Sequence, residues 1–301
     1  MDLPAFLTPA LVAYLFLALA GLIDKVLLQT SIVSPRAYAF YVGILSVAAV
    51  VLLPFGVVNI PDRRILFAAL VSGVAGVYAL WSFYNALKEY EASRVITSTG
   101  ALIPVFTLVL SVIFLNEFLG FFQLLGFFIL LLGGAAVSLR ENVRKTFTFE
   151  LFNHAAVAAA LFAVSFSLMR FVFLAEPFLN GLFWTRIGSV LGALTIIVIP
   201  ENFRRIYWAT KKAPKTAPAP FLFNQGLGGL GGLLQNYAIS LGSAALVGAI
   251  QGVQYAFLFV LSLTLVRYFP QLKEVTTLRQ KVGKALAIVA IGFGLYFMTI
   301  R

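Results

Sequence analysis

The chain has 301 residues, of which 61% are hydrophobic and 11% are charged. A typical soluble domain has roughly 25% charged residues, so this composition excludes an ordinary soluble protein and indicates an integral membrane protein. The net charge of +11 does not require a nucleic-acid partner. We expect none, because Lys and Arg in loops set the orientation of membrane proteins. The chain has no cysteine, which excludes disulfides and thiolate chemistry.

Apolar runs follow one another along the whole chain and leave no room for a soluble domain. Each has close to the roughly 20 residues that cross a bilayer as a helix, and none has the period of two that strands show. We interpret the first run as a transmembrane helix and not as a signal peptide, because no basic residue precedes it. The ten runs lie at about 9–31, 36–55, 65–87, 93–115, 118–138, 153–174, 179–200, 221–241, 243–267 and 282–300.

Two polar segments interrupt this pattern. Segment 201–220 holds five basic residues and ends in a Pro/Ala stretch. We interpret it as a loop with one interfacial helical turn, anchored by Tyr207 and Trp208. The second segment, 139–152, is also basic and joins the two halves of the chain.

The two halves resemble each other in sequence. The second run ends AVVLLP at Pro54 and the seventh ends TIIVIP at Pro200, while GALIPVFTLVLSVIFL (100–115) parallels QGVQYAFLFVLSLTLV (251–266). Five helices per half is an odd number, so the second half enters the membrane inverted, a recurring plan of secondary transporters with the substrate site near the midplane. We therefore predict an all-α integral membrane protein of ten transmembrane helices, arranged as two inverted five-helix repeats, residues 1–145 and 146–301.

The basic residues predict the orientation of these helices. Of the 22 Lys and Arg residues, Lys25, Arg170 and Arg186 lie within helices, and Arg63, Arg64 and Arg301 lie on one side of the membrane. The remaining 16 fall on the other side, in the loops after the odd-numbered helices. By the positive-inside rule, both termini are predicted to be outside the cytoplasm.

Residues 65–138 carry a recognisable order of elements. A Gly-rich helix is followed by Asn85-Ala-Leu-Lys, a turn with Ala-Ser, a helix containing Pro104, the pair Asn116-Glu117, and a helix with Gly126 near its start and Gly133-Gly134 near its end. This pattern resembles the EamA-type module of the drug/metabolite transporter (DMT) superfamily. The resemblance covers nearly the whole chain and is weaker in the second half, where Tyr255 stands near the position of Pro104 and Tyr268 stands in place of Glu117.

Proteins similar to this family export amino acids, other metabolites or toxic compounds, by proton exchange or facilitated diffusion. The resemblance and the repeat together predict a secondary transporter of small metabolites (an amino acid, a drug or another polar organic solute) that works by alternating access as an exporter or exchanger. We expect it in the cell (inner or plasma) membrane, in contact with lipid, as a monomer or homodimer, without cofactor or metal. A lipid flippase and a non-transporting membrane partner remain alternatives. An enzyme is not expected, because the chain lacks HExxH and Asp-rich motifs and has only one histidine, His154.

Charged groups within helices are costly in a membrane and tend to be functional. Asp24 is the only acid well inside a predicted helix, and it could take up a proton or bind a substrate amine. Alternatively it pairs with a base or lies near water at the helix end. Arg170 and Arg186 could attract an anion, since the guanidinium matches carboxylates and phosphates. They could instead extend to the interface and pair with Glu176.

Uncharged polar side chains cluster in the eighth and ninth runs. Asn224 and Gln235 are about three turns apart and share a helix face, and Gln251, Gln254 and Tyr255 share another. These groups suit a polar cavity, although they could instead join helices by hydrogen bonds worth about 0.6 kcal/mol each. In the first half, Trp81 and Tyr84 could form an aromatic wall or simply pack. The predicted substrate-binding residues are Tyr78, Trp81, Tyr84, Asn85, Ser98, Arg186, Asn224, Gln235, Asn236, Gln251, Gln254 and Tyr255, and Asp24 is the candidate for proton coupling.

Overall fold

Helices make up nearly all of the chain that the structure, a computed structural model, describes: residues 3–30, 34–90, 92–138, 149–212, 214, 218–265 and 278–300. No strand occurs in these ranges, and the all-helical prediction is confirmed. In chain order the elements are α1 (Leu7–Thr30), α2 (Pro35–Leu45), the 3-10 helix η1 (Ser46–Phe55), α3 (Arg63–Glu89), α4 (Ala92–Leu115), α5 (Phe121–Ser138), α6 (Phe149–Ala175), α7 (Phe178–Val198), α8 (Pro200–Lys212), α9 (Pro218–Leu241), α10 (Ala244–Ala249), α11 (Gln251–Leu265) and α12 (Leu278–Thr299).

Eight of these helical stretches are long and apolar enough to cross a membrane. The protein is therefore a multi-pass membrane protein. The apolar part of α5, Phe121–Val137, is shorter than such a span, and α9 is not among the eight. Helix α9 is as long as α1 but contains glycines and amide side chains, which lower its hydropathy.

Most predicted runs coincide with a helix, because a long apolar run has no other stable form in lipid. Segment 201–220 is the main difference. In place of a loop with a single turn, the chain forms the 13-residue helix α8. Its buried side is short, with Asn202 and Ile206, while Tyr207 and Trp208 are exposed, as expected of a helix that lies at an interface.

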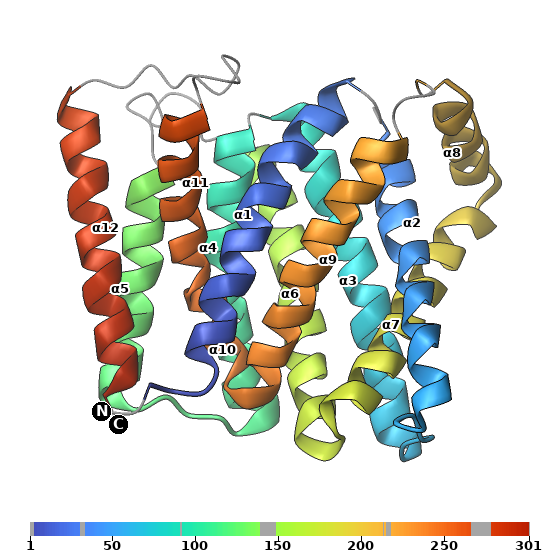
Figure 1. Cartoon of the computed structure of the whole chain (residues 1–301), viewed down its shortest axis with the longest axis horizontal. Helices are drawn as coiled ribbons and strands as arrows, with labels where there is room; N and C mark the ends of the chain where they lie inside the picture. Colours follow the sequence, from blue (N-terminus) through green and yellow to red (C-terminus); the bar gives the residue numbers. More distant parts are fainter. Residues whose placement is uncertain are drawn as a thin grey trace.

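The long helices stand side by side, with the N- and C-termini at one end of the bundle and α8 at the other (Figure 1). Helix α3 packs along α6 and α7, α1 along α9, α5 along α12, and α4 along α6. Each of these pairs joins a helix from the first half of the chain to one from the second. The halves are therefore interleaved and form one bundle.

Helices α3 and α7 approach each other through glycine. A Cβ atom added at Gly73 would lie 2.1 Å from the carbonyl oxygen of Thr185, and one at Gly188 would lie 2.4 Å from that of Leu70. Small residues allow such close backbone contact, which is the main source of helix association in membranes. The α3–α7 contact therefore forms a tight wall on one side of the bundle.

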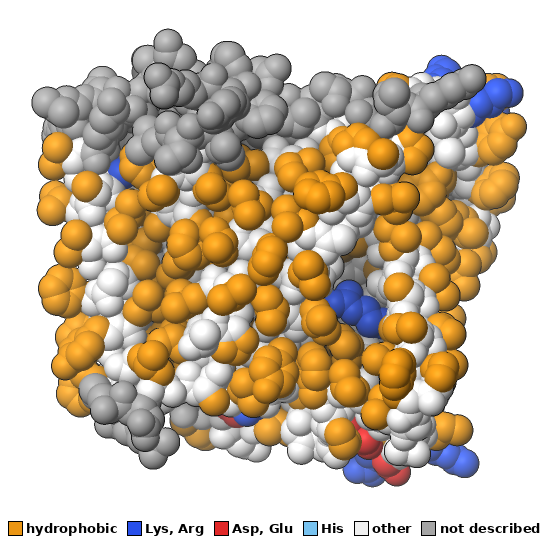
Figure 2. All heavy atoms as spheres, viewed as in Figure 1, with side chains coloured by type: hydrophobic (Ala, Val, Ile, Leu, Met, Phe, Trp, Pro, Cys, Tyr) orange, Lys and Arg blue, Asp and Glu red, His pale blue; other side chains and the backbone are white. Residues whose placement is uncertain are grey.

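The outer surface is mainly apolar, and charged side chains gather near its two ends (Figure 2). Large side chains on the flanks are widely exposed, for example Phe67 at 70%, Phe114 at 71% and Val198 at 75%. Such a surface is unfavourable in water and suits lipid. One exception lies on the face shown, where basic side-chain atoms are visible in a hollow between α9 and α2, midway along the bundle (Figure 2).

Candidate functional site

A cavity of about 770 Å³ lies within the bundle and is lined by residues of both halves. Its size is within the range of small-molecule sites. Serine, threonine, tyrosine and amide side chains contribute to its wall, together with Asp24, Arg186 and Lys284. An apolar part of the wall comes from α6, where Phe162 and Phe166 stack with ring centroids 5.9 Å apart.

The structure brings most of the predicted site residues to this cavity and leaves four outside it. Those that line it are Asp24, Tyr84, Arg186, Asn224, Gln235, Asn236, Gln251, Gln254 and Tyr255. Those that do not are Tyr78, Trp81, Asn85 and Ser98.

The periodicity of the helices explains why four of the predicted residues do not line the cavity. On α3 the cavity face runs through Val77, Leu80, Tyr84 and Leu87, so positions 78, 81 and 85 point elsewhere. Tyr78 hydrogen-bonds Thr195 on α7 at 3.0 Å, and the Trp81 ring lies beneath the guanidinium of Arg36 at 5.6 Å. Of Trp81 and Tyr84, only Tyr84 lines the cavity, and Trp81 packs against neighbouring side chains, which is the other alternative considered. Ser98 misses on α4, where its neighbours Thr97 and Thr99 line the cavity instead.

Asp24 lies at a junction of α1, α2 and α9. Its Oδ1 atom accepts hydrogen bonds from the hydroxyl of Tyr38 and, at 2.6 Å, from the amide of Asn224. The Tyr38 ring packs edge-on against Tyr84, with centroids 4.7 Å apart. The amide oxygen of Asn224 is buried and has no protein partner in the described chain. This corner of the cavity therefore holds one acid, two donors to it and one unsatisfied acceptor.

Arg186 lies on α7 in a different part of the cavity, beside α9. In the orientation that satisfies both ends of the Asn236 amide, its oxygen accepts a hydrogen bond from Nη2 of Arg186 at 3.0 Å, and its nitrogen donates to the carbonyl of Gly232 at 3.2 Å. Within the described ranges no carboxylate forms an ion pair with Arg186. The predicted alternative, a pair with Glu176, is not formed, since Glu176 accepts instead from Asn180.

The amides and tyrosines of α9 and α11 connect helices as well as line the cavity. Gln235 donates to the hydroxyl of Tyr14 at 3.2 Å, and that hydroxyl donates to the carbonyl of Val247 at 2.8 Å. The Tyr255 hydroxyl donates to the carbonyl of Ile96 on α4 at 3.0 Å. Both predicted roles of these polar groups, lining and joining, therefore apply to the same residues.

The glycines of α9 differ in what surrounds them. Gly231 packs against α1, where an added Cβ would lie 2.9 Å from Leu17. At Gly228 and Gly232, which line the cavity, the described atoms within 4 Å of such a Cβ belong to Ala20, at 3.5 Å from Gly228, and to the guanidinium of Arg186, at 3.8 Å from Gly232. These two glycines therefore widen the cavity beside Arg186.

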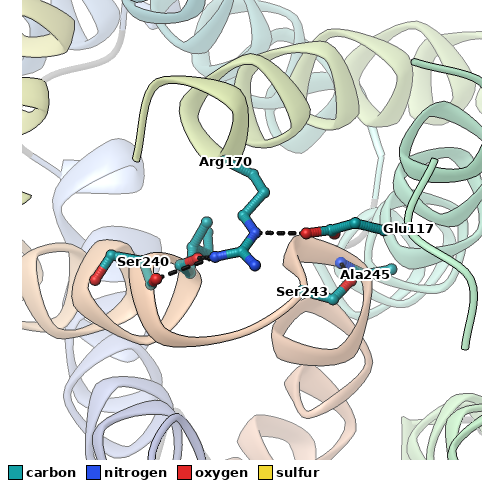
Figure 3. A network of polar contacts seen from close by, with 6 residues as sticks. Glu117, Arg170, Ser240, Ser243 and Ala245 are labelled. Carbon is teal, nitrogen blue, oxygen red and sulfur yellow. Dashed lines mark hydrogen bonds and ion pairs between the residues drawn. The ribbon is translucent and has the colours of Figure 1, made fainter. Parts of the chain in front are cut away.

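A second arginine network lies outside the cavity wall, toward the end where the termini lie. Arg170 forms an ion pair of 2.7 Å with Glu117, in the segment between α4 and α5, and donates at 3.0 Å to the carbonyls of Ile239 and Ser240 at the end of α9 (Figure 3). It thus joins α6, α9 and the α4–α5 connection at one point. The cavity extends the other way, to Leu87 and Tyr90 at the far end of α3.

Sequence reasoning missed several polar groups of the cavity, among them Tyr14 and Lys284. It also missed Tyr38, which donates to Asp24. A single tyrosine in a mainly apolar helix is a weak signal. Lys284 was assigned to a loop, but it lies in α12, is 6% exposed, and holds its ammonium 4.6 Å from the centroid of the Phe259 ring. In the described part of the chain, no three acidic or histidine side chains gather as a metal site would require.

Comparison with known proteins identifies the kind of module that builds this cavity. Residues 6–139 match the model of the EamA-like transporter family, and no curated protein matches the chain. Among solved structures, 16 chains are similar. One crystal structure covers 99% of this chain and 98% of its own with a TM-score of 0.67 and 18% sequence identity, which is a likeness of fold alone. The family match over residues 6–139 and the apolar helices together support a membrane transporter of the drug/metabolite type.

Proposed function

We propose that the protein is a secondary transporter that carries a small polar organic solute through the central cavity by alternating access, as an exporter or exchanger. The observation that carries this proposal is the cavity itself, because its wall joins polar side chains from both halves of the chain. A site at the interface of two repeats is the arrangement that lets one repeat move against the other around a bound solute. The cell membrane and the solute class (amino acid, drug or another metabolite) belong to the same proposal.

The proposal includes ten membrane-spanning segments in two inverted repeats, 1–145 and 146–301. In this arrangement α2 and η1 form one segment, α10 and α11 form another, and α5 and α9 also span. The helix contacts support it. If each helix is replaced by its counterpart in the other half, the α3–α6 contact corresponds to the α9–α1 contact, and the α4–α6 contact corresponds to the α11–α1 contact. All four contacts are present.

We place both termini outside the cytoplasm. Helix α8, with its basic residues, is at the end opposite the termini (Figure 1), and Arg63 and Arg64 begin α3 at the end where the termini lie. With this orientation the Arg170–Glu117 network lies on the outer side, and the cavity extends toward the cytoplasm. This would be an inward-facing state, in which a solute enters from the cell interior.

Lipid translocation is a second candidate, favoured by the hollow between α9 and α2 on the apolar face (Figure 2). A lateral opening is what a lipid flippase needs, whereas a solute transporter needs a path from water. No feature of the described chain favours a non-transporting role, and the family consists of transporters rather than enzymes.

The test is transport by the purified protein in liposomes. Vesicles are loaded with radiolabelled amino acids, organic acids or cationic drugs, and efflux is compared with that of protein-free vesicles. Protein-dependent movement of a solute down its gradient is the expected result. If no solute moves and a fluorescent phospholipid is translocated in the same vesicles, lipid translocation replaces the proposal.

A further inference from the structure

Arg186 has an unusual electrostatic position for a residue within a membrane bundle. Arg186 lies in the middle of α7 and lines the cavity. One of its N–H groups is used by Asn236. Its other N–H groups have no hydrogen-bond acceptor among the described residues, and Arg186 is one of the residues that line the cavity.

Asp24 is the one acidic side chain among the described residues that line the cavity, beside the basic Arg186 and Lys284, and it is too far from Arg186 to neutralise its charge. Asp24 bonds Asn224, and Arg186 bonds Asn236. The guanidinium also lies beside Gly232, and Gly232 is eight residues from Asn224 on α9, which corresponds to about 12 Å along the helix at 1.5 Å per residue. The cavity therefore has a distinct acidic end and a distinct basic position.

The distance between Arg186 and Asp24 also restricts the charge that a bound solute can carry. In an α-amino acid the α-carboxylate and the α-ammonium are attached to one carbon atom, so these two groups cannot reach Arg186 and Asp24 together. An ammonium next to a carboxylate on Arg186 would meet no acid of the described chain there. A solute whose charge is only negative has no such cost.

The surroundings of Arg186 leave room for a bound anion. Gly232 lacks a side chain at the point where its Cβ would approach the guanidinium to 3.8 Å. The hydroxyls of Thr185 and Ser189 also line the cavity, but they donate to the backbone carbonyls of Leu182 and Thr185, so the guanidinium is the donor that an anion would meet here. The aromatic pair Phe162 and Phe166 provides an apolar wall for the rest of the molecule.

We propose that the transported solute is an organic anion and that Arg186 binds its carboxylate or phosphate group. This inference rests on the proposed transport function and narrows its solute class. The guanidinium binds either oxyanion through two parallel N–H···O bonds, which an ammonium group cannot reproduce. The amide of Asn236 holds the guanidinium in position.

The test is ligand binding by the full-length protein in detergent, measured as the shift in its thermal unfolding temperature. Four probes share a phenyl body and differ in charge: 3-phenylpropionate, its neutral amide 3-phenylpropionamide, zwitterionic phenylalanine, and phenyl phosphate. We expect stabilisation by 3-phenylpropionate, by phenyl phosphate or by both, and much weaker effects of the amide and of phenylalanine. The two acids distinguish a carboxylate solute from a phosphate solute.

The same thermal-unfolding measurements on variants test whether Arg186 binds the acid. Arg186→Gln should weaken binding of the acid by about tenfold or more, the usual effect of losing a hydrogen-bonded charge. Arg186→Lys keeps the charge and should give an intermediate loss, and it remains informative if Arg186→Gln does not fold. Arg64→Gln, at the exposed start of α3, should bind as the unchanged protein does.

Three results would overturn the inference: equal binding of acid and amide, unchanged acid binding by Arg186→Gln, or no binding of either acid. None of them touches the transport proposal, since liposomes would still report movement of neutral or cationic solutes. Conversely, an acid that binds at Arg186 but is never transported contradicts the transport proposal and leaves the anion site in place.

Discussion

Asp24 accepts two hydrogen bonds through one carboxylate oxygen, from Tyr38 and Asn224. Both donors come from helices other than its own, so a change in its protonation alters bonds that connect α1 to α2 and to α9. A partly buried acid with such partners is suited to couple proton uptake to helix movement. This is why we retain Asp24 as the proposed site of proton coupling.

Asp24→Asn should abolish the pH dependence of transport, because the amide cannot gain or lose a proton in the working range. The measurement is solute flux in liposomes at mildly acidic and at neutral pH. Glu150→Gln, an exposed acid at the start of α6, is the control and should keep the pH dependence. An unchanged pH profile in Asp24→Asn would remove this residue from the coupling mechanism.

The Arg170–Glu117 pair is mostly buried, with side-chain exposures of 13% and 19%. Arg170→Met should therefore lower stability by about 2–3 kcal/mol, because it leaves the Glu117 carboxylate without its charge partner. The double variant Arg170→Met/Glu117→Gln should recover part of that loss. Unfolding in detergent measures both, and a double variant that loses the sum of the two single losses would show that the residues are not coupled.

At the scale of helices, α9 carries glycines both inside and outside the cavity wall. The glycines at 228 and 232 line the cavity, and those at 226 and 229 have no atom within 4 Å of an added Cβ. Position 229 is not part of the cavity wall. The helix therefore offers a test position and a matched control within one turn.

Gly232→Leu should reduce acid binding and transport by about tenfold, since overpacking a filled site costs about 1–3 kcal/mol. The added side chain occupies the space beside Arg186 and leaves the backbone carbonyl that holds Asn236 in place. Gly229→Leu should have little effect in the same assays. If both substitutions act equally, the loss comes from the helix and not from the cavity.

The sequence predicted the positions of the helices better than it predicted which face of each helix lines the cavity. Apolar runs locate α1 and α6 within a few residues, because lipid allows no other backbone arrangement for such runs. Helix α8 was mostly missed, because its Lys and Arg residues hide the short buried stripe of Asn202 and Ile206. Trp81 was assigned to the cavity because polar and aromatic residues surround it, whereas packing of α3 against α7 turns that face away.

The sequence also did not predict which residues of different helices contact each other. Asp24 and Asn224 are 200 positions apart, and no local pattern connects them. The amides of α9 and α11 were found because their spacing alone puts them on one helix face. Tyr38 gave no such signal, and its role becomes visible only once α1 and α2 are placed side by side.

At the scale of the whole molecule, the orientation can be tested without removing any native residue, because the chain has no cysteine. A cysteine added after Arg301 should react with an impermeant maleimide in intact cells. Lys212→Cys, on α8 at the opposite end (Figure 1), should react only after permeabilisation. The reverse pattern would invert the proposed topology and make the Arg170–Glu117 end cytoplasmic.

The glycine content of α9 has a consequence for how the backbone of this helix behaves. Five of the seven residues from 226 to 232 are glycine, and each weakens a helix by about 1 kcal/mol relative to alanine. Backbone amides there should exchange with deuterium faster than those of α3 or α6, on the side wetted by the cavity. Asn236, which holds Arg186, follows this weak stretch by one turn. An anion bound at Arg186 would slow that exchange, so deuterium uptake in α9 reports solute binding directly.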